Sequence, residues 1–481
     1  MSSTTGRESP PAAPQDDVSV GAVNDADRGA SYASGARILT VGIASTGIFT
    51  FAYLAAASHA LDKPSYSRIS LCWAIMFVIL SVIYRPIEQL LSRTIADRRA
   101  RGQTRQSLRV PAAIQIGFAS VFLVIAIAMR DQIQNGMFDG SSALYWILVV
   151  GVVAYGASYF ARGWLAGHER FALYGGLVFL ESTSRFLFAL AVIVGVGSGQ
   201  GIVGLGMAVA PFASLTVMPF ALTRMRVRGG PRVAVADAAG EGPAHAGFEQ
   251  EATDHLSLRH GARFAIAVVG IMLSEQALLN AGVLIVAANA GAGGLTEGIT
   301  GFVFNVMLIV RAPLQLFQAV QTSILPHLAG LEARESADEF HRAIRITILA
   351  ITAFGLAVAL GLLLIGPPVM TAFLGNKGFS YGRFGLALVG LGMGLHLISG
   401  TLNQAALARG RAMWAAGAWL ISAALFVAFV VASAIGNEVT RVEVGYFAAT
   451  AVLSVLLAGV YRMGAAPASG AQKPAAAEMA A

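Results

Sequence analysis

The sequence predicts an all-α integral membrane protein of about twelve transmembrane helices, arranged as two pseudo-symmetric lobes of about six helices each. Of its 481 residues, 56% are hydrophobic and only 12% are charged, whereas a soluble domain has roughly 25% charged residues. Apolar stretches of about twenty residues, the length that crosses a hydrocarbon core roughly 30 Å thick, recur along nearly the whole chain. The composition is that of a multi-pass protein whose solvent is the bilayer.

The apolar spans follow one another with short polar loops between them, except for one longer polar segment with mixed charges, Gly and Pro. We expect helices near residues 38–60, 69–92, 110–129, 143–165, 172–196, 201–223, 264–288, 299–323, 344–366, 384–407, 412–435 and 443–461. The expected domains are a disordered cytoplasmic tail (1–34), an N-lobe (35–224), a cytoplasmic linker (225–261), a C-lobe (262–463) and a disordered C-terminal tail (464–481).

The cationic residues orient these spans, because Lys and Arg in short loops stay on the cytoplasmic side. Most of them, Arg162 included, fall in alternate loops that we assign to the cytoplasm. The opposite loops hold only Lys63, Arg68, Arg130, Lys377, Arg383 and Arg441. We therefore expect both termini in the cytoplasm, a location in the cytoplasmic (inner) membrane, and no nucleic-acid partner despite a net charge of +7.

Two spans carry the same polar stripe, which consists of an arginine, a glutamine four residues later and a polar residue seven residues later. The members are Arg85, Gln89 and Ser92 in the second span and Arg311, Gln315 and Gln318 in the eighth. These offsets place the three side chains on one helical face. Because each stripe lies in the second helix of its half, the pattern predicts a duplication with a site between the repeats, against the alternative of coincidence in a leucine-rich background.

Ionisable residues inside a membrane are expensive and usually face a cavity or one another. Arg311 has no acidic residue within one helical turn, so we expect it to contact an anionic substrate; a hydrogen bond to facing carbonyls is the alternative. Arg85 stands three residues before Glu88, a spacing that permits an ion pair and is equally compatible with lining a cavity. We accordingly expect Arg311 to contribute more to function than Arg85.

Glu181 and Arg185 lie four residues apart, which favours a mutual ion pair over a substrate contact for Arg185. Glu275 has no cationic residue on its own span, so it is either a protonatable coupling group or the partner of a cation on another helix, such as Arg311. The amide of Asn403 can bind a hydroxyl group or simply hydrogen-bond to a neighbouring helix.

Motifs for other chemistry are absent from the sequence. It contains no phosphate-binding Gly-Lys-Ser/Thr loop, no paired-histidine metal motif and no Gly-x-Ser-x-Gly nucleophile motif, and Cys72 is its single cysteine. We expect neither metal nor cofactor, and the sequence disfavours an ATP-driven pump. It also disfavours an enzyme.

Several short runs stand out, namely Arg85–Arg93 followed by Ala96–Gly102, Arg162–Gly167 with Tyr174, Arg311–Pro313 through Pro326, and Leu402–Ala405. They resemble the polysaccharide biosynthesis proteins, the Wzx-like transporter branch of the multidrug/oligosaccharidyl-lipid/polysaccharide (MOP) flippase superfamily. The resemblance implies a MATE/MOP-like fold with a central cavity between two six-helix lobes, alternating access, and arginines that attract the diphosphate of a polyprenyl-linked sugar. The chain departs from the lipid II flippase branch, since it has about twelve spans rather than fourteen and its first span lacks an internal arginine.

We therefore expect a secondary transporter that moves a lipid-linked (polyprenyl-phosphate) oligosaccharide or polysaccharide precursor for the cell envelope. Arg311 and Arg85, and less strongly Arg185, are expected to bind the diphosphate. Gln89, Gln315, Gln318 and Asn403 are expected to contact sugar hydroxyls, and Glu275 to couple transport to a proton or cation.

The expected partners are the lipid-linked sugar, membrane lipids and, left open, glycosyltransferases or a polymerase of the same pathway. Two other functions stay in view. A multidrug exporter of the same superfamily would bind lipophilic cations in an acidic cavity. A membrane component or enzyme of a polysaccharide synthase complex would transfer sugars.

Overall fold

The computed structural model describes residues 42, 45–100, 108–227, 263, 266–289, 298–311, 313–314, 317, 337–375, 378–433 and 435–463. Within these ranges all regular secondary structure is helical, and ten helices are long and apolar enough to cross a membrane. After a helix at 45–60 come α2 (Lys63–Ile79), a π-helical stretch (Leu80–Tyr84), α3 (Arg85–Ala100), α4 (Arg109–Ala128), a second π-helical stretch (Gln132–Met137), α5 (Ser142–Gly167), α6 (Phe171–Ile193), α7 (Gly199–Leu215) and α8 (Val217–Val227). The second half contains the helices Ile266–Asn289 and Ile299–Arg311, then α11 (Ala337–Leu374), α12 (Arg383–Ala408), α13 (Ala412–Val431) and α14 (Glu438–Arg462).

The predicted all-α membrane fold is confirmed. The second span begins at Lys63, earlier than hydropathy predicts, because Asp62 caps the helix by accepting a hydrogen bond from the Ser65 N–H and a proline occupies the first turn. The first and eighth expected spans are described only in part, as the helices 45–60 and Ile299–Arg311. The expected N-terminal tail, the linker from residue 228 onward and the C-terminal tail lie outside the described residues, so those domain boundaries stay predictions.

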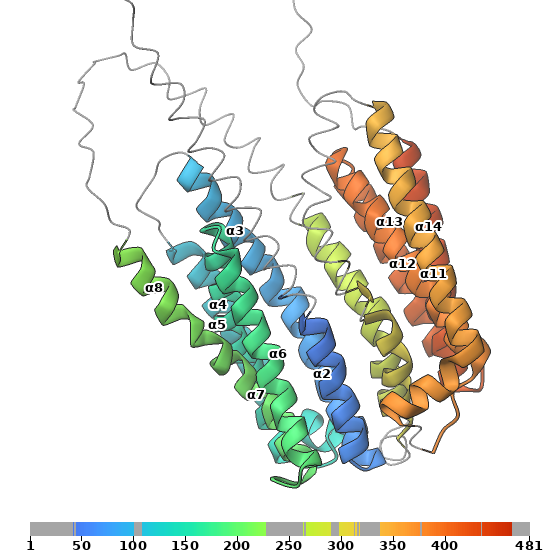
Figure 1. Ribbon diagram of the computed structural model, residues 1–481, viewed down its shortest axis with the longest axis horizontal. Coiled ribbons are helices and arrows are strands. Elements are labelled where there is room, and N and C mark those ends of the chain that lie inside the picture. Colours follow the sequence, from blue (N-terminus) through green and yellow to red (C-terminus); the bar gives the residue numbers. More distant parts are fainter. Residues whose placement is uncertain are drawn as a thin grey trace, which may run out of the picture.

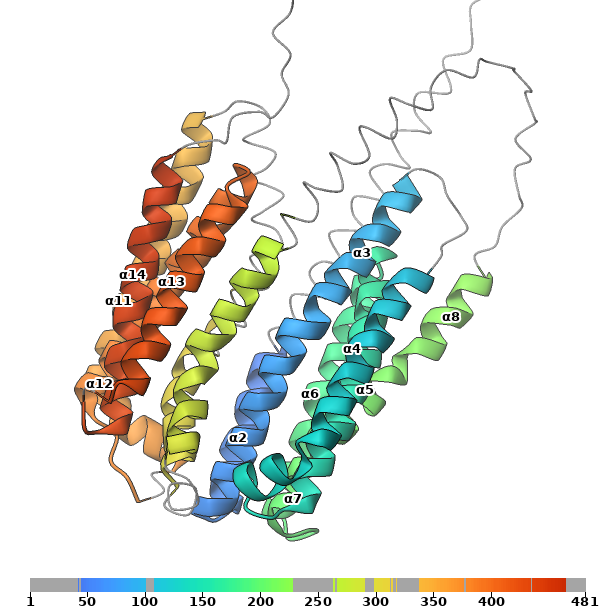
Figure 2. The same cartoon turned by 180° about the vertical axis from the view of Figure 1, so that it is seen from behind.

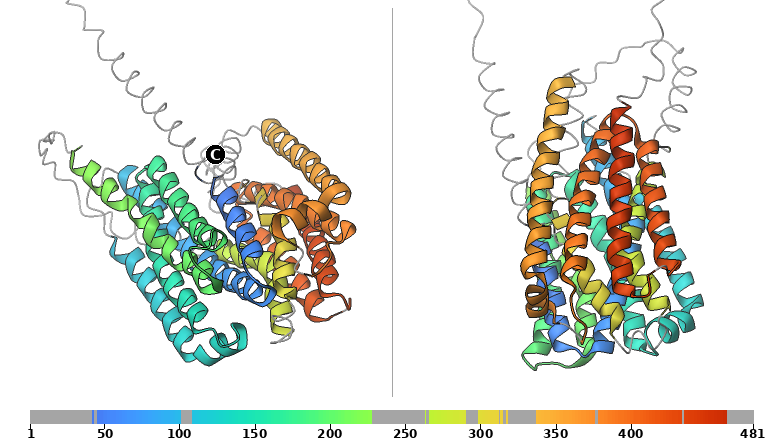
Figure 3. Two further views of the ribbon diagram at one scale, coloured as in Figure 1. Left: turned by 60° about the horizontal axis from the view of Figure 1, so that its bottom comes forward. Right: turned by 90° about the vertical axis from the view of Figure 1, so that its right-hand side faces the viewer.

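The helices gather into two groups, which we call the N-lobe (45–227) and the C-lobe (266–463) (Figure 1). Within the N-lobe α5 packs against α3 and α7, and α6 packs against α7; within the C-lobe α12 packs against α11 and α14. Both Figure 1 and Figure 2 show the two groups approaching each other at the end where α2 begins and diverging toward the opposite end. Figure 3 shows α2 and the helix Ile266–Asn289 side by side between the groups, where Leu71 and Ala287 are buried together.

Glycines allow the helices of each lobe to approach closely, as is common in membrane proteins. A Cβ on Gly163 of α5 would lie 2.7 Å from the backbone oxygen of Glu88 in α3. In the C-lobe a Cβ on Gly355 of α11 would lie 2.9 Å from the Cα of Gly394 in α12. The contact at Gly163 fixes α3 on α5 next to the charged residues described below.

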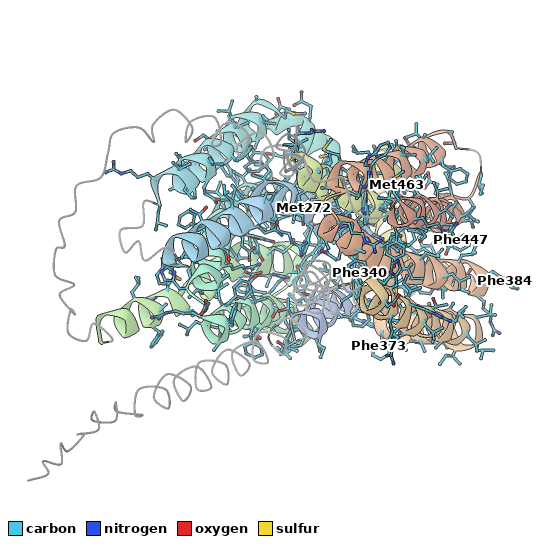
Figure 4. All side chains as sticks on the ribbon, turned by 90° about the horizontal axis from the view of Figure 1, so that it is seen from above. Met272, Phe340, Phe373, Phe384, Phe447 and Met463 are labelled. Carbon is cyan, nitrogen blue, oxygen red and sulfur yellow. The ribbon has the colours of Figure 1, made fainter. Side chains whose placement is uncertain are left out.

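The outer surface of the helices is apolar. In α11, Leu349 and Leu364 have exposed fractions of 69% and 60%, and Phe384 at the start of α12 reaches 80%. Figure 4, seen along the helices, shows Phe384 and Phe373 at the margin of the C-lobe. Large apolar side chains in such positions are compatible with lipid and not with water.

Candidate functional site

Three charged residues form a buried network inside the N-lobe, which we call the N-lobe charge cluster: Arg162 of α5 with Glu181 and Arg185 of α6. The predicted pair is present, since Arg185 Nη2 lies 3.1 Å from Glu181 Oε1. Arg162 Nη2 forms an ion pair with the other carboxylate oxygen. The side chains of Arg162, Glu181 and Arg185 are only 10%, 6% and 3% exposed, so one carboxylate neutralises part of the charge of two buried guanidinium groups.

Hydroxyl groups complete this network. Ser158 Oγ donates to Glu181 Oε2 at 3.3 Å, and Arg185 Nη2 also donates to the Tyr155 hydroxyl at 2.7 Å. Buried charges are tolerated when they are paired and hydrogen-bonded in this way. Arg185, expected as a weaker substrate contact, therefore has its donors directed to N-lobe residues, and its role toward a substrate stays a prediction.

Arg162 is a residue whose position sequence analysis misjudged. Assigned to a cytoplasmic loop, it lies inside α5 and is only 8% exposed. Its guanidinium carbon is 4.5 Å from the centre of the Tyr159 ring. Hydropathy placed it at the end of a span, and its partner Glu181 stands on another helix, where no local spacing rule could find it.

The side chain of Arg85 makes no hydrogen bond or ion pair with a described residue, unlike those of Arg162, Arg185 and Arg311. It is half-buried at the start of α3. The neighbouring Glu88, one candidate partner in the sequence, instead accepts a hydrogen bond from the Tyr174 hydroxyl at 2.6 Å. Arg85 thus presents a guanidinium group whose donors are available.

The backbone immediately before Arg85 is π-helical. The Arg85 N–H donates to the carbonyl of Leu80, five residues earlier, rather than to the fourth residue. Pro86 explains the break, since it lacks an N–H and its ring crowds the preceding turn. Single π turns inside α-helices are often found at functional sites.

Arg311 is held within the C-lobe. Its Nη2 donates to the Leu279 carbonyl at 3.1 Å and to Asn280 Oδ1 at 2.6 Å, and its guanidinium lies 4.7 Å from the centre of the Phe304 ring. Its buried Nε has no hydrogen-bond partner among the described residues. A hydrogen bond to facing carbonyls was the alternative that the sequence left open for Arg311. Because Arg311 makes such a bond, we place the candidate anion-binding site at Arg85 instead.

Glu275 lies half-buried on the helix Ile266–Asn289 and makes no hydrogen bond or ion pair with a described residue. Among the described residues, the cation that attracts it electrostatically is Arg85 of the opposite lobe. The expected counter-charge, Arg311, instead donates to Leu279 and Asn280. We therefore take Arg85 and Glu275, which attract each other across the two lobes, as the candidate site.

The side-chain amides expected to bind sugar hydroxyls are not grouped with Arg85 and Glu275 by any hydrogen bond among the described residues. Asn403 is 6% exposed, and its Oδ1 accepts a hydrogen bond from Trp419 Nε1 at 3.2 Å. Gln89 is exposed on α3, whereas Gln315 and Gln318 lie outside the described residues. Their contact with a substrate stays a prediction.

A further buried carboxyl group, which sequence analysis did not weigh, is Glu443 in α14. It is 4% exposed and makes no hydrogen bond or ion pair within the described ranges. Its signal in the sequence was an acidic residue beside the start of an apolar span, which resembles an ordinary interfacial position. The described part of the chain holds no group of three or more His, Cys, Asp or Glu residues that could bind a metal ion.

No family model matches the sequence, and no curated protein matches it. Solved structures do match the fold. A mutant form of the Vibrio cholerae MATE transporter VcmN superimposes with a TM-score of 0.58 at 14% identity over 90% of this chain and 98% of its own. An outward-facing multidrug resistance MATE family transporter of the MOP superfamily gives a TM-score of 0.61 at 13% identity, with 89% and 94% covered. A MATE protein in complex with MaL6 gives 0.60 at 14% identity, with 90% and 95% covered.

At these identities the likeness concerns the fold. Most of both chains is covered in each comparison, so the likeness extends to both lobes. The chain is a multi-pass membrane protein with the fold of the MATE transporters of the MOP superfamily.

Proposed function

We propose that this protein is a secondary transporter that moves a lipid-linked (polyprenyl-phosphate) oligosaccharide or polysaccharide precursor across the cytoplasmic membrane by alternating access. The fold supports the transporter, and Arg85 supports the anionic substrate. This half-buried guanidinium has no hydrogen-bonded partner among the described residues. An unpaired charge inside a membrane protein is costly, and an anionic ligand would remove that cost.

An arginine suits a diphosphate because its planar fork can donate two parallel hydrogen bonds to phosphate oxygens. Glu275 gives this binding a natural competitor, since its carboxylate attracts the same arginine from the opposite lobe. Protonation of Glu275 removes this attraction and leaves Arg85 available to the substrate. Proton uptake at Glu275 and substrate binding at Arg85 are then favourably coupled.

A multidrug exporter is the second candidate, and a specific observation favours it. The C-lobe contains two carboxyl groups, Glu275 and Glu443, that make no hydrogen bond or ion pair with a described residue. Such groups can bind a lipophilic cation as readily as Arg85 can bind an anion. The structural matches include multidrug resistance transporters, so the fold is compatible with both candidates.

Purified protein in liposomes distinguishes these functions. A short-chain polyprenyl-diphosphate sugar with a fluorescent group reports lipid flipping, and a fluorescent lipophilic cation reports drug export. We expect flipping by the wild type, a large loss with Arg85→Ala, a smaller loss with Arg311→Ala and no loss with Arg130→Ala, whose residue is exposed. Movement of the cation alone, abolished by Glu275→Gln and unchanged by Arg85→Ala, would establish the exporter instead.

A further inference from the structure

A chain of hydrogen bonds joins the two lobes at the end of the molecule where α2 begins. The Tyr66 hydroxyl of α2 donates to Asn305 Oδ1 of the C-lobe helix Ile299–Arg311. Asn305 Nδ2 in turn donates to the Tyr381 hydroxyl at 3.3 Å, and that hydroxyl donates to the Gly375 carbonyl at 2.8 Å. Tyr66 and Asn305 are completely buried, so water does not compete for these bonds.

Two more hydrogen bonds link the lobes at the same end. The Gly301 N–H donates to Ser67 Oγ at 3.1 Å, and Ser58 Oγ donates to the Leu374 carbonyl. Position 301 requires a glycine, since a Cβ there would lie 2.8 Å from a ring carbon of Tyr66. The backbone of the C-lobe helix therefore rests directly on α2, and side-chain polar groups bridge the two.

Aromatic rings surround this polar contact. Phe302 lies against Tyr381 with ring centres 4.5 Å apart, and Phe51 of the N-lobe meets Phe373 of the C-lobe at 6.1 Å. The hydrogen bonds are thus enclosed by apolar side chains. Because only neutral groups form them, they can break without leaving a bare charge in the membrane, unlike the ion pairs of the N-lobe charge cluster.

These contacts lie at one end only of a bundle whose two groups of helices diverge toward the other end (Figures 1 and 2). We propose that Tyr66, Ser67, Gly301, Asn305 and Tyr381 form a latch that holds the transporter closed at this end, which the charge distribution assigns to the outside of the membrane, and that breaking the latch admits the outward-open state. This inference rests on the proposed transport function. It identifies the residues that set the equilibrium between the two open states.

Labelling of a reporter cysteine tests the latch without any substrate. The background variant is Cys72→Ala, which removes the single natural cysteine, and the reporter is Ile75→Cys, which lies at the contact between the lobes beyond the latch. A membrane-impermeant maleimide is added from the outside and, in separate inverted vesicles, from the inside. Tyr66→Phe removes one latch hydrogen bond and keeps the ring, so outside labelling should rise by about fivefold, the population shift expected from one net hydrogen bond.

Tyr145→Phe is the matched control. The Tyr145 hydroxyl is also buried and donates to a carbonyl, that of Ala126, but both residues belong to the N-lobe. Loss of this hydrogen bond should lower the stability of the N-lobe and leave the labelling of the reporter cysteine from each side unchanged. Equal outside labelling for Tyr66→Phe and Tyr145→Phe overturns the latch.

A second measurement keeps the latch testable if the Tyr66 variant folds poorly. Phe51→Cys and Phe373→Cys place two thiols across the contact, where the two ring centres lie 6.1 Å apart and a short bifunctional thiol-reactive reagent can join them. Joining the two thiols should abolish outside labelling of the reporter at position 75. When the reagent contains a reducible bond, reduction should restore that labelling. Unchanged outside labelling in the joined protein contradicts the latch, whereas altered labelling without any flipping of lipid-linked sugar supports the latch and rejects the proposed substrate.

Discussion

Glu181 is the residue whose loss should most damage the stability of the N-lobe. Its carboxylate is shared by Arg162 and Arg185, and all three side chains are at most 10% exposed. At the 3.1 Å separation of Arg185 Nη2 and Glu181 Oε1, the Coulomb attraction is about 5 kcal/mol for an effective dielectric constant of roughly 20. Breaking a buried pair by removing one partner typically costs about 3–5 kcal/mol, which agrees in size.

The substitution Glu181→Gln keeps the shape of the side chain and leaves two buried guanidinium groups without an anion. We expect it to lower the free energy of unfolding by about 3–5 kcal/mol, measured by denaturant titration in mixed micelles. Adding Arg185→Gln restores the original net charge of the cluster, so the double variant should be more stable than the sum of the two single effects. The hydrogen bond that Arg185 donates to the Tyr155 hydroxyl is lost both in the single variant Arg185→Gln and in the double variant, so its loss cancels in this comparison.

A result of less than about 1 kcal/mol for Glu181→Gln, the range of exposed ion pairs, would refute the reasoning. Additive effects in the double-mutant cycle would refute it as well, because additivity means that Glu181 and Arg185 do not interact. Ser158→Ala serves as a reference for the loss of one hydrogen bond from an uncharged donor to the same carboxylate.

Arg85→Lys should reduce flipping of a lipid-linked sugar by at least about tenfold, since an ammonium cannot replace the two-pronged guanidinium, whose hydrogen bonds to charged groups contribute about 1.5–3 kcal/mol each; a rate equal to that of the wild type in liposomes matched for protein would remove Arg85 from the site. Glu275→Gln should leave the protein inserted but make transport independent of an imposed proton or cation gradient, and normal gradient dependence would exclude Glu275 from coupling. Gly163→Ala should lower the midpoint of thermal unfolding, because its Cβ would lie 2.7 Å from the Glu88 carbonyl oxygen, whereas Gly176→Ala, with open space around the added carbon, should not; equal midpoints would show that α3 and α5 can separate freely.

The membrane spans could be predicted from the sequence because the thickness of the hydrocarbon core sets their length independently of the rest of the fold. A hydropathy profile carries no information about helix caps, so it could not locate the start of the second span, which is capped by Asp62. The spacing rule for one helix found the pair of Glu181 and Arg185. It could not find Arg162, whose partner lies on a different helix.

The contacts between the lobes were even harder to predict, because their partners lie far apart in the sequence. Tyr66 and Asn305 are 239 positions apart in the chain, and Asn305 and Tyr381 are 76 apart. Tyr66 and Asn305 are ordinary residues in apolar helices and Tyr381 stands in the loop before α12, so no local pattern distinguishes them. Arg311 could be recognised as an unusual charge, but whether its donors meet a ligand or the Leu279 carbonyl depends on a neighbouring helix.

The π-helical stretch Leu80–Tyr84 connects α2 to α3 without interrupting the helical chain. A π turn contains one residue more than the surrounding α-helix needs, and one residue corresponds to about 100° of rotation about the axis. The Arg85 N–H donates to the Leu80 carbonyl across this turn, so the extra residue is taken up locally between α2, which bears Tyr66, and α3, which bears Arg85. Deleting a single residue from this stretch would turn that bond into an ordinary α-helical one and leave both the latch and Arg85 in place, which makes a one-residue deletion a way to test what the π turn itself contributes to transport.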